Sequence, residues 1–404
     1  MIENISFKNY KCLSGKSFDL KPLNIFTGYN GRGKSSVMQA LLMLGQSVSK
    51  DDSNSLLQFH VNGKFVKLGD FDELLSDTNN FALEFDMRMQ DAEKQSHSVN
   101  LGYEMSDDYK VGKLTKLVVD KDDYYSSQSS FSEKQEKGEE KKILRQLPHY
   151  INEVFDSNNI HYVSANRMGP VSFVERKEIP ESHSVGANGD MTINTLHTYQ
   201  LKIEPIMNED ITDTASHTLI DSVAIWMDYI MNGEKGSVTV DDGSDTSKTE
   251  TRSSVLRLDF IQNDRSYHAY NVGFGYSYIL SIVVTALIAK AGNIVIVENP
   301  EAHLHPEAQF RLTELLVKLA TRGVQVFIET HSEHVVNAVR LAVIRKQFAI
   351  TNDQIGLFFF DYDYSKRDLS IEKNGRIEDW PSRFFDQYQL ELAQIIREGA
   401  QVQE

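Results

Sequence analysis

Apolar residues recur with two different periods along the chain. The first seven residues alternate apolar and polar side chains, which is typical of a half-buried strand. A short apolar run at Leu23–Phe26 predicts a second strand, and residues 35–45 predict a helix directly after it. In the last third of the chain, strands expected at 293–297 and 324–328 alternate with helices, which indicates a parallel sheet and an α/β fold. Those helices are expected at 278–290, 307–320 and 333–345.

The middle and the tail of the chain have weaker patterns. Strands are expected at 64–68, 81–85, 255–260, 267–271, 354–362 and 368–372, and helices at 143–155, at 218–231 and from about Phe384. Loop-like or flexible segments are expected at 120–142, 181–215 and 232–252, where Ser, Gly, Asn, Asp and Thr accumulate.

The composition is that of a globular protein, with 40% hydrophobic and 25% charged residues among 404. The formal net charge of −16 excludes a bulk polycation that coats nucleic acid, although it is compatible with a local basic groove. Cys12 is the single cysteine, which excludes an internal disulfide and a cysteine-based zinc site and fits a reducing cytoplasm. The longest nearly apolar run, Ile279–Ala289, is too short to cross a bilayer, and the N-terminus lacks the apolar core of a signal peptide. We therefore expect a cytoplasmic protein with no membrane segment.

The strongest chemical signal follows the strand at Leu23–Phe26. Residues 28–35 read Gly-Tyr-Asn-Gly-Arg-Gly-Lys-Ser, the G-x-x-x-x-G-K-[ST] pattern of a P-loop between a strand and a helix. Glycines let the backbone turn so that N–H groups point at phosphate oxygens, and the helix start adds its positive end. Lys34 is expected to reach the β- and γ-phosphates of ATP, and the Ser35 hydroxyl to bind Mg²⁺. The expected nucleotide-binding residues here are Asn30, Gly31, Arg32, Gly33, Lys34, Ser35 and Ser36.

Two later strands end in residues that suit the same chemistry. The apolar run at 294–297 ends in Glu298, a carboxylate that would hold Mg²⁺ beside the P-loop. The run at 324–328 is followed by Glu-Thr-His-Ser, and His331 in this segment is suited to sense a γ-phosphate. Between the P-loop and Glu298, residues 271–278 form another glycine-rich turn that opens a helix.

The order of these motifs resembles the ABC-type ATPases of the SMC, RecF and OLD-nuclease class. Residues 7–36 look like their N-terminal strand pair and Walker A, 273–280 like the signature motif, and 298–306 like Walker B and the D-loop. The Glu-Asn-Pro-Glu-Ala-His-Leu-His-Pro and Glu-Thr-His-Ser segments are most similar to short ATPases of bacterial anti-phage defence, such as the Septu ATPase subunit. This resemblance implies an SMC/RecF-like head, a switch role for His331, and a homodimer or higher oligomer formed through the nucleotide sites. It also implies that Gly273, Gly275 and Ser277 act on the nucleotide of the opposite subunit.

Two positions depart from the pattern of that class. Glu298 stands where most members have Asp, and the next residue is Asn299 instead of the Glu that activates water. Either Glu301 takes over as the base, or hydrolysis is slow and the protein acts mainly as an ATP-gated clamp. Gly273 replaces the usual Ser of the signature, so either Ser277 supplies the hydroxyl or the backbone N–H groups suffice. The expected catalytic residues are therefore Glu301, Glu298 and His331, with Ser35 and Glu298 on the metal.

Several further motifs have both a chemical and a structural interpretation. Asp361-Tyr362-Asp363 resembles the acids of an appended nuclease domain, but a turn between two tail strands is favoured because no second acidic motif precedes it. Arg167 either contacts nucleotide or a partner subunit, or forms a structural ion pair. Tyr124 and Tyr125 could stack on nucleic acid, although a solvated loop is favoured. Zinc binding is disfavoured against D-loop and switch roles for His303, His305, His331 and His334.

The motifs divide the chain into an ATPase head built from two ends. We expect head segments at 1–90 and 256–350, a helical and loop-rich insertion at 91–255, and a small C-terminal extension at 351–404. The leading functional hypothesis is an ATP-binding and hydrolysing dimer switch that controls a separate effector, most plausibly a nuclease, in anti-phage defence. A RecF-like DNA-repair clamp and a nearly inactive ATP-binding scaffold are the alternatives, and DNA is a possible ligand.

Overall fold

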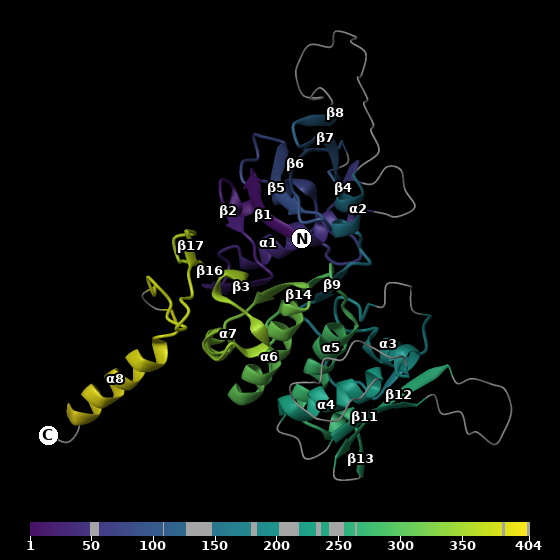
Figure 1. The fold of residues 1–404 in the computed structure, drawn as a ribbon, viewed down its shortest axis with the longest axis vertical. Helices are drawn as coiled ribbons and strands as arrows, with labels where there is room; N and C mark the ends of the chain where they lie inside the picture. Colours follow the sequence, from purple (N-terminus) through teal and green to yellow (C-terminus); the bar gives the residue numbers. More distant parts are fainter. Residues whose placement is uncertain are drawn as a thin grey trace, which may run out of the picture.

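The computed structural model describes residues 1–48, 56–107, 109–126, 148–178, 184–201, 218–231, 236–241, 254–262, 265–381 and 384–401 (Figure 1). Within these ranges the strands form three sheets, and the α/β class predicted from the sequence is confirmed. The expected segments 127–142, 143–147, 202–215 and 242–252 lie outside the described residues. Short 3-10 helices occur at Lys11–Leu13, Phe71–Leu74, Ala269–Asn271, Gln347–Ala349 and Asn352–Gln354.

The central sheet is the one that carries the predicted chemistry. Its strand order is β17-β16-β3-β15-β14-β9, and all neighbours are parallel except β16 and β17. Successive side chains of these strands enter two different cores, since Val295 and Val297 face one side and Ile296 the other. The strands are β3 Leu23–Gly28, β9 Ile160–Val163, β14 Ile294–Glu298, β15 Gln325–Glu329, β16 Ile355–Phe360 and β17 Lys366–Leu369.

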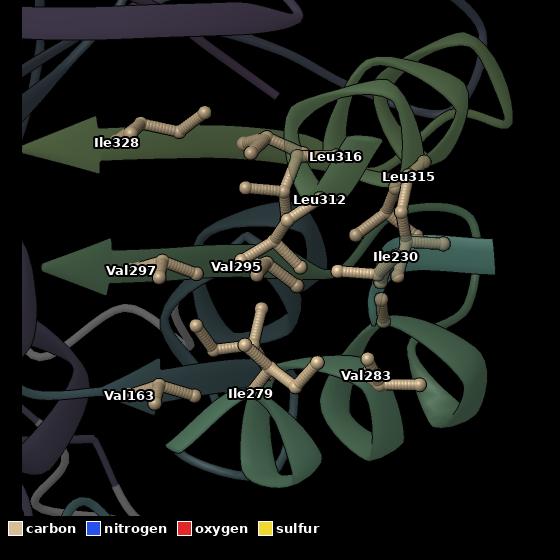
Figure 2. Close-up of a cluster of buried hydrophobic side chains, with 14 of the residues drawn as sticks. Val163, Ile230, Ile279, Val283, Val295, Val297, Leu312, Leu315, Leu316 and Ile328 are labelled. Atoms are coloured by element: carbon tan, nitrogen blue, oxygen red, sulfur yellow. The ribbon is translucent and has the colours of Figure 1, made fainter. Parts of the chain in front are cut away.

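Helices cover one face of this sheet. Figure 2 shows Ile279 and Val283 of α5 and Leu312 and Leu316 of α6 meeting the apolar side chains of β9, β14 and β15. The predicted helices at 278–290, 307–320, 333–345 and 218–231 are present with slightly different ends. The layer consists of α5 Phe274–Ile288, α6 Pro306–Thr321 and α7 Glu333–Arg345. Two further helices, α3 Thr192–Tyr199 and α4 Leu219–Met231, pack against α5.

The other face packs on α1 and an antiparallel sheet of order β2-β1-β5-β6-β7-β4, in which β8 also pairs with β7. The predicted boundary at residue 91 is wrong, because β6 pairs with β5 along its whole length, from Ala82↔Glu104 to Gln90↔Ser96. Residues 91–126 therefore continue the head sheet and do not begin an insertion. The bounds are β1 Ile2–Lys8, β2 Ser17–Asp19, β4 Gln58–His60, β5 Ala82–Gln90, β6 Ser96–Met105, β7 Val111–Val119, β8 Asp122–Ser126, α1 Lys34–Gln46 and α2 His149–Phe155.

A third sheet lies beside α4 and α5. Its order is β10-β12-β11, with β13 also on β12, and the bounds are β10 Phe173–Glu175, β11 Gly236–Asp241, β12 Val255–Gln262 and β13 Arg265–His268. Here α3 and β11 replace parts of the expected loops at 181–215 and 232–252, because both bury apolar side chains against the core. The strand expected at 64–68 is instead a short bend with one bridge, Asn62↔Lys67.

The C-terminal helix α8, Gln387–Gln401, extends away from the body (Figure 1). Leu390, Leu392, Ile395 and Ile396 on this helix are all more than 40% exposed. Among the described residues, no helix is long and apolar enough to span a bilayer.

Candidate functional site

The P-loop has a backbone conformation that depends on its glycines. Gly28, Gly31 and Gly33 have φ values of +119°, +69° and +107°, which side chains other than glycine rarely adopt. A Cβ on Gly28 would lie 2.2 Å from the carbonyl oxygen of Phe360, and one on Gly33 would lie 2.7 Å from the Sγ of Cys12. The loop leads directly into α1, whose start has no side-chain cap, so the first backbone N–H groups are available to an anion.

Lys34 is held inside this loop. Its side chain is buried, and its Nζ donates hydrogen bonds to the carbonyl oxygens of Gly28 at 3.1 Å and Tyr29 at 2.7 Å. Burial lowers the pKa of Lys34, while the nearby Glu329 carboxylate opposes that change. The two carbonyl oxygens thus hold the Lys34 ammonium group inside the loop. Phosphate oxygens of a ligand would take the place of these two acceptors.

The remaining predicted P-loop residues have distinct positions. Asn30 and Gly31 are exposed at the tip of the loop, and Ser36 lies in the first turn of α1, where its carbonyl oxygen accepts a hydrogen bond from the Tyr10 hydroxyl. Arg32 turns away from the acidic strands, toward the segment between β16 and β17.

Two carboxylates meet at the ends of neighbouring strands beside the P-loop. Glu298 ends β14 and Glu329 ends β15, and the register of the two strands places these residues side by side. The Ser35 hydroxyl donates to Glu329 Oε1 at 3.0 Å, while Glu329 Oε2 is buried and has no hydrogen-bond partner among the described residues. Burial raises the pKa of Glu329 to about 7, with the Glu298 and Glu301 carboxylates adding to the rise and the Ser35 hydrogen bond opposing it. A hydroxyl and two carboxylates are the hard oxygen ligands that Mg²⁺ prefers, so the donor set fits this ion.

Glu329 is not among the site residues predicted from the sequence, although the sequence contains a signal for it. The segments Ile294–Glu298 and Gln325–Glu329 both read as an apolar strand that ends in Glu. Only the parallel pairing of β14 with β15 shows that the two carboxylates share one edge of the sheet.

Arg167 fixes the backbone just after β14. Its guanidinium donates to the carbonyl oxygens of Ser164 at 3.0 Å, Glu298 at 2.6 Å and Asn299 at 2.8 Å. It is buried, and burial lowers its pKa to about 10. Asn299 has a φ of +45°, so these hydrogen bonds hold an unfavourable backbone conformation at the acidic edge. The hydrogen-bond partners of Arg167 are backbone carbonyl oxygens and not the carboxylate of a structural ion pair, while a contact with nucleotide or a partner subunit stays a prediction.

Glu301 and His331 are brought together on the other side of the acidic pair. Glu301 Oε1 accepts a hydrogen bond from the His331 backbone N–H at 2.7 Å, and Oε2 accepts one from the Thr330 hydroxyl at 2.8 Å. A carboxylate can accept further hydrogen bonds at each oxygen, so Glu301 stays able to bind a water molecule. Desolvation and the Lys34 ammonium lower the pKa of His331, which favours the neutral imidazole.

The expected signature residues lie in a different environment. Gly273 is exposed at the start of α5, whereas Gly275 is buried, and a Cβ there would lie 3.1 Å from the His303 carbonyl oxygen. The Oγ of Ser277 is buried and has no hydrogen-bond partner among the described residues. Of these three residues, Gly273 is exposed, Gly275 is buried and Ser277 is partly buried, and their action on the nucleotide of a second subunit stays a prediction.

The other candidate motifs lie in a helix cap, a turn and a strand, where their side chains contact the protein itself. His305 caps α6 through its Nδ1, which accepts from the Glu307 N–H at 3.3 Å. Among the described residues, no three His, Cys, Asp or Glu side chains are grouped so that they alone could hold a metal ion. Asp361 and Asp363 lie in the turn between β16 and β17, where Asp361 pairs with Arg367 at 2.7 Å. Tyr124 and Tyr125 lie on β8 and pack partly on the core, so a solvated loop does not describe them.

Two family models match different parts of the chain. The AAA ATPase domain family matches residues 1–336, which include the P-loop, both carboxylates and His331. Residues 350–395 match a family described as a protein of unknown function, DUF3696. The comparison with curated proteins gave no match.

Solved structures resemble the chain at low sequence identity. A crystal structure of the SmcHead bound to the C-winged helix domain of ScpA is 13% identical, with a TM-score of 0.50 over 92% of this chain and 98% of that chain. The SMC head domain from Thermotoga maritima is 10% identical, with a TM-score of 0.44 over 92% of this chain and 99% of that one. The recombination mediator protein RecF-ATPrS is also 10% identical, with a TM-score of 0.42 over 92% and 98%. The first of these likenesses supports a shared fold, whereas the other two TM-scores are too low to do so alone.

The matched family covers most of the chain and contains every residue that converges on the acidic edge of the central sheet. The chain therefore belongs to the AAA ATPase domain family, and its fold is that of an SMC/RecF-like ABC-type P-loop ATPase head.

Proposed function

We propose that this chain binds ATP with Mg²⁺ at the P-loop, hydrolyses it, and works as a nucleotide-gated dimer that controls a separate effector protein. The observation that carries the proposal is the convergence of Lys34, Ser35, Glu298 and Glu329 at one edge of the central sheet. This cluster combines an ammonium group, an uncapped helix start and a cation site. It therefore suits a polyphosphate better than any uncharged ligand.

Each of these groups has a definite task in that proposal. Lys34 and the first N–H groups of α1 bind phosphate oxygens, and Ser35, Glu298 and Glu329 hold the cation. When bound, Mg²⁺ neutralises charge on the β- and γ-phosphate oxygens. Glu301 orients and deprotonates the attacking water, since Asn299 offers an amide and no basic group. His331, bonded through its backbone to Glu301, is the residue placed to respond to the γ-phosphate.

The proposal that this chain controls a partner protein rests on its similarity to other proteins and not on a contact within this chain. The related SMC head was solved with a domain of ScpA bound to it, so heads of this fold can carry a second protein. The motif resemblance favours an effector such as a nuclease in anti-phage defence, with two heads meeting through the P-loop and the exposed Gly273 end of α5. A RecF-like clamp on DNA is the alternative, and turnover in the presence of DNA separates the two.

ATP turnover by the purified full chain tests this proposal. We expect slow hydrolysis that double-stranded DNA does not change, no nucleotide binding by Lys34→Ala, and retained binding without turnover by Glu301→Gln. Glu93→Gln, which removes an exposed carboxylate between β5 and β6, is the matched control and keeps wild-type turnover. Strong stimulation by DNA would shift the function to the clamp, and ATP binding without any hydrolysis would leave only a scaffold.

A further inference from the structure

Two exposed tyrosines stand next to the P-loop. Tyr362 and Tyr364 lie in the turn between β16 and β17, with 69% and 46% of their surfaces exposed. The guanidinium carbon of Arg32 lies 4.8 Å from the ring centroid of Tyr362 and 4.3 Å from that of Tyr364, both within the range of cation–π contacts. The Nε of Arg32 is buried and has no hydrogen-bond partner among the described residues.

The turn is firmly joined to the P-loop. The register of β16 and β3 pairs Phe360 with Gly28, and the Tyr29 N–H donates to the Phe360 carbonyl oxygen at 3.0 Å. The Tyr29 ring meets that of Tyr362 edge-on, with centroids 6.0 Å apart. The position of the tyrosines relative to a bound triphosphate is therefore fixed by the sheet itself.

The strand order shows which end of a nucleotide these rings would meet. Glu298 and Glu329 end β14 and β15, which lie on one side of β3, whereas β16 lies on the other side. The cation and the terminal phosphates belong at the carboxylates, so the opposite end of the nucleotide extends across the P-loop toward β16.

We propose that Tyr362, supported by Tyr364 and Arg32, is the surface on which the nucleobase stacks. This inference depends on the proposed function, because it names the base subsite of the same nucleotide site. Arg32 lies against both rings and holds the pair in place, while the large exposed area of Tyr362 remains free for a planar base. Stacking is tolerant of base identity because every base has a π-face, so the site takes nucleoside triphosphates without selecting adenine over guanine.

Calorimetric titration of the full chain with ATP and with inorganic tripolyphosphate, both with Mg²⁺, tests the subsite. Tyr362→Ala is expected to raise the Kd for ATP and for GTP about tenfold, while the Kd for tripolyphosphate stays unchanged because that ligand has no base. Tyr362→Phe keeps the ring and should bind ATP like the wild type. Tyr109→Ala removes another exposed tyrosine, far from the P-loop in sequence, and should change neither affinity.

An unchanged Kd for ATP in Tyr362→Ala would overturn the subsite and leave nucleotide binding intact. Equal weakening of ATP and tripolyphosphate would also overturn it, since it would mean that the substitution disturbs the P-loop. Failure of the wild type to bind either ligand would refute the proposed function itself, and the base subsite with it.

Discussion

Replacing Glu329 by glutamine gives a sharp test of the acidic edge. The substitution removes one buried negative charge and keeps the size of the side chain and an acceptor for the Ser35 hydroxyl. Without a bound cation, the folded protein must hold the Glu329 carboxylate close to Glu298 and Glu301 in a desolvated position. Glutamine relieves that repulsion.

The size and pH dependence of the effect follow from the raised pKa. The pKa of Glu329 rises from 4.5 to about 7 on folding, so the folded state binds the proton more tightly than the unfolded state. The wild type therefore loses about 3 kcal/mol of its free energy of unfolding as the pH increases from about 4.5 through 7. Glutamine does not titrate, so the free energy of unfolding of Glu329→Gln rises relative to that of the wild type by about 3 kcal/mol as the pH increases from 4.5 to 8.

Chemical denaturation at pH 5 and pH 8, with a chelator and without nucleotide, measures this difference. Glu93→Gln removes an exposed carboxylate and is the matched control, with no expected change in relative stability. Mg²⁺ and ATP should reverse the order, because the wild type gains binding energy at the cation site and the variant loses a ligand. A stability difference between variant and wild type that is the same at both pH values would refute the reasoning.

Two further substitutions test the backbone around the site. Arg167→Leu leaves three backbone carbonyl oxygens without their donor and should lower the free energy of unfolding by about 3 kcal/mol. Arg376→Leu removes an exposed arginine and should change the free energy of unfolding little. A loss below about 1 kcal/mol for Arg167→Leu would contradict its structural role. Gly28→Ala forces a Cβ against Phe360 at a φ of +119° and should cost about 3 kcal/mol by denaturation, compared with about 1 kcal/mol for Gly31→Ala, which meets no atom within 4 Å. Equal costs at the two glycines would show that contact with β16 does not constrain the loop.

Local signals were sufficient for the P-loop and for most of the central sheet. The glycine spacing at 28–33 and the strand before it are local features of the sequence, so the loop and α1 could be placed without knowing the fold. The role of Glu329 could not be predicted in this way, because it depends on the register between two strands that are 27 residues or more apart in the chain.

Elsewhere the signal was present but weak. Val99, Leu101, Tyr103 and Met105 alternate along β6 and all are buried, yet Gly and polar residues between them hide the strand. In α3 the buried side chains include Asn194 and Thr195, so polar composition was a poor guide to burial there. Such polar residues reach the interior because they hydrogen-bond to backbone, as the Asn194 side chain does with Lys177 N–H.

The strand that carries the P-loop comes early in the chain, but both of its neighbours come late. Asn24 on β3 donates to the Val326 carbonyl oxygen across 302 residues, and β16 on the other side is later still. At typical ribosomal rates, roughly 15 to 60 seconds pass before β3 has any strand to pair with. During that interval β3, an apolar strand, has no partner strand, and its unpaired edge is prone to aggregation. The P-loop can therefore take its place between β15 and β16 only late in synthesis.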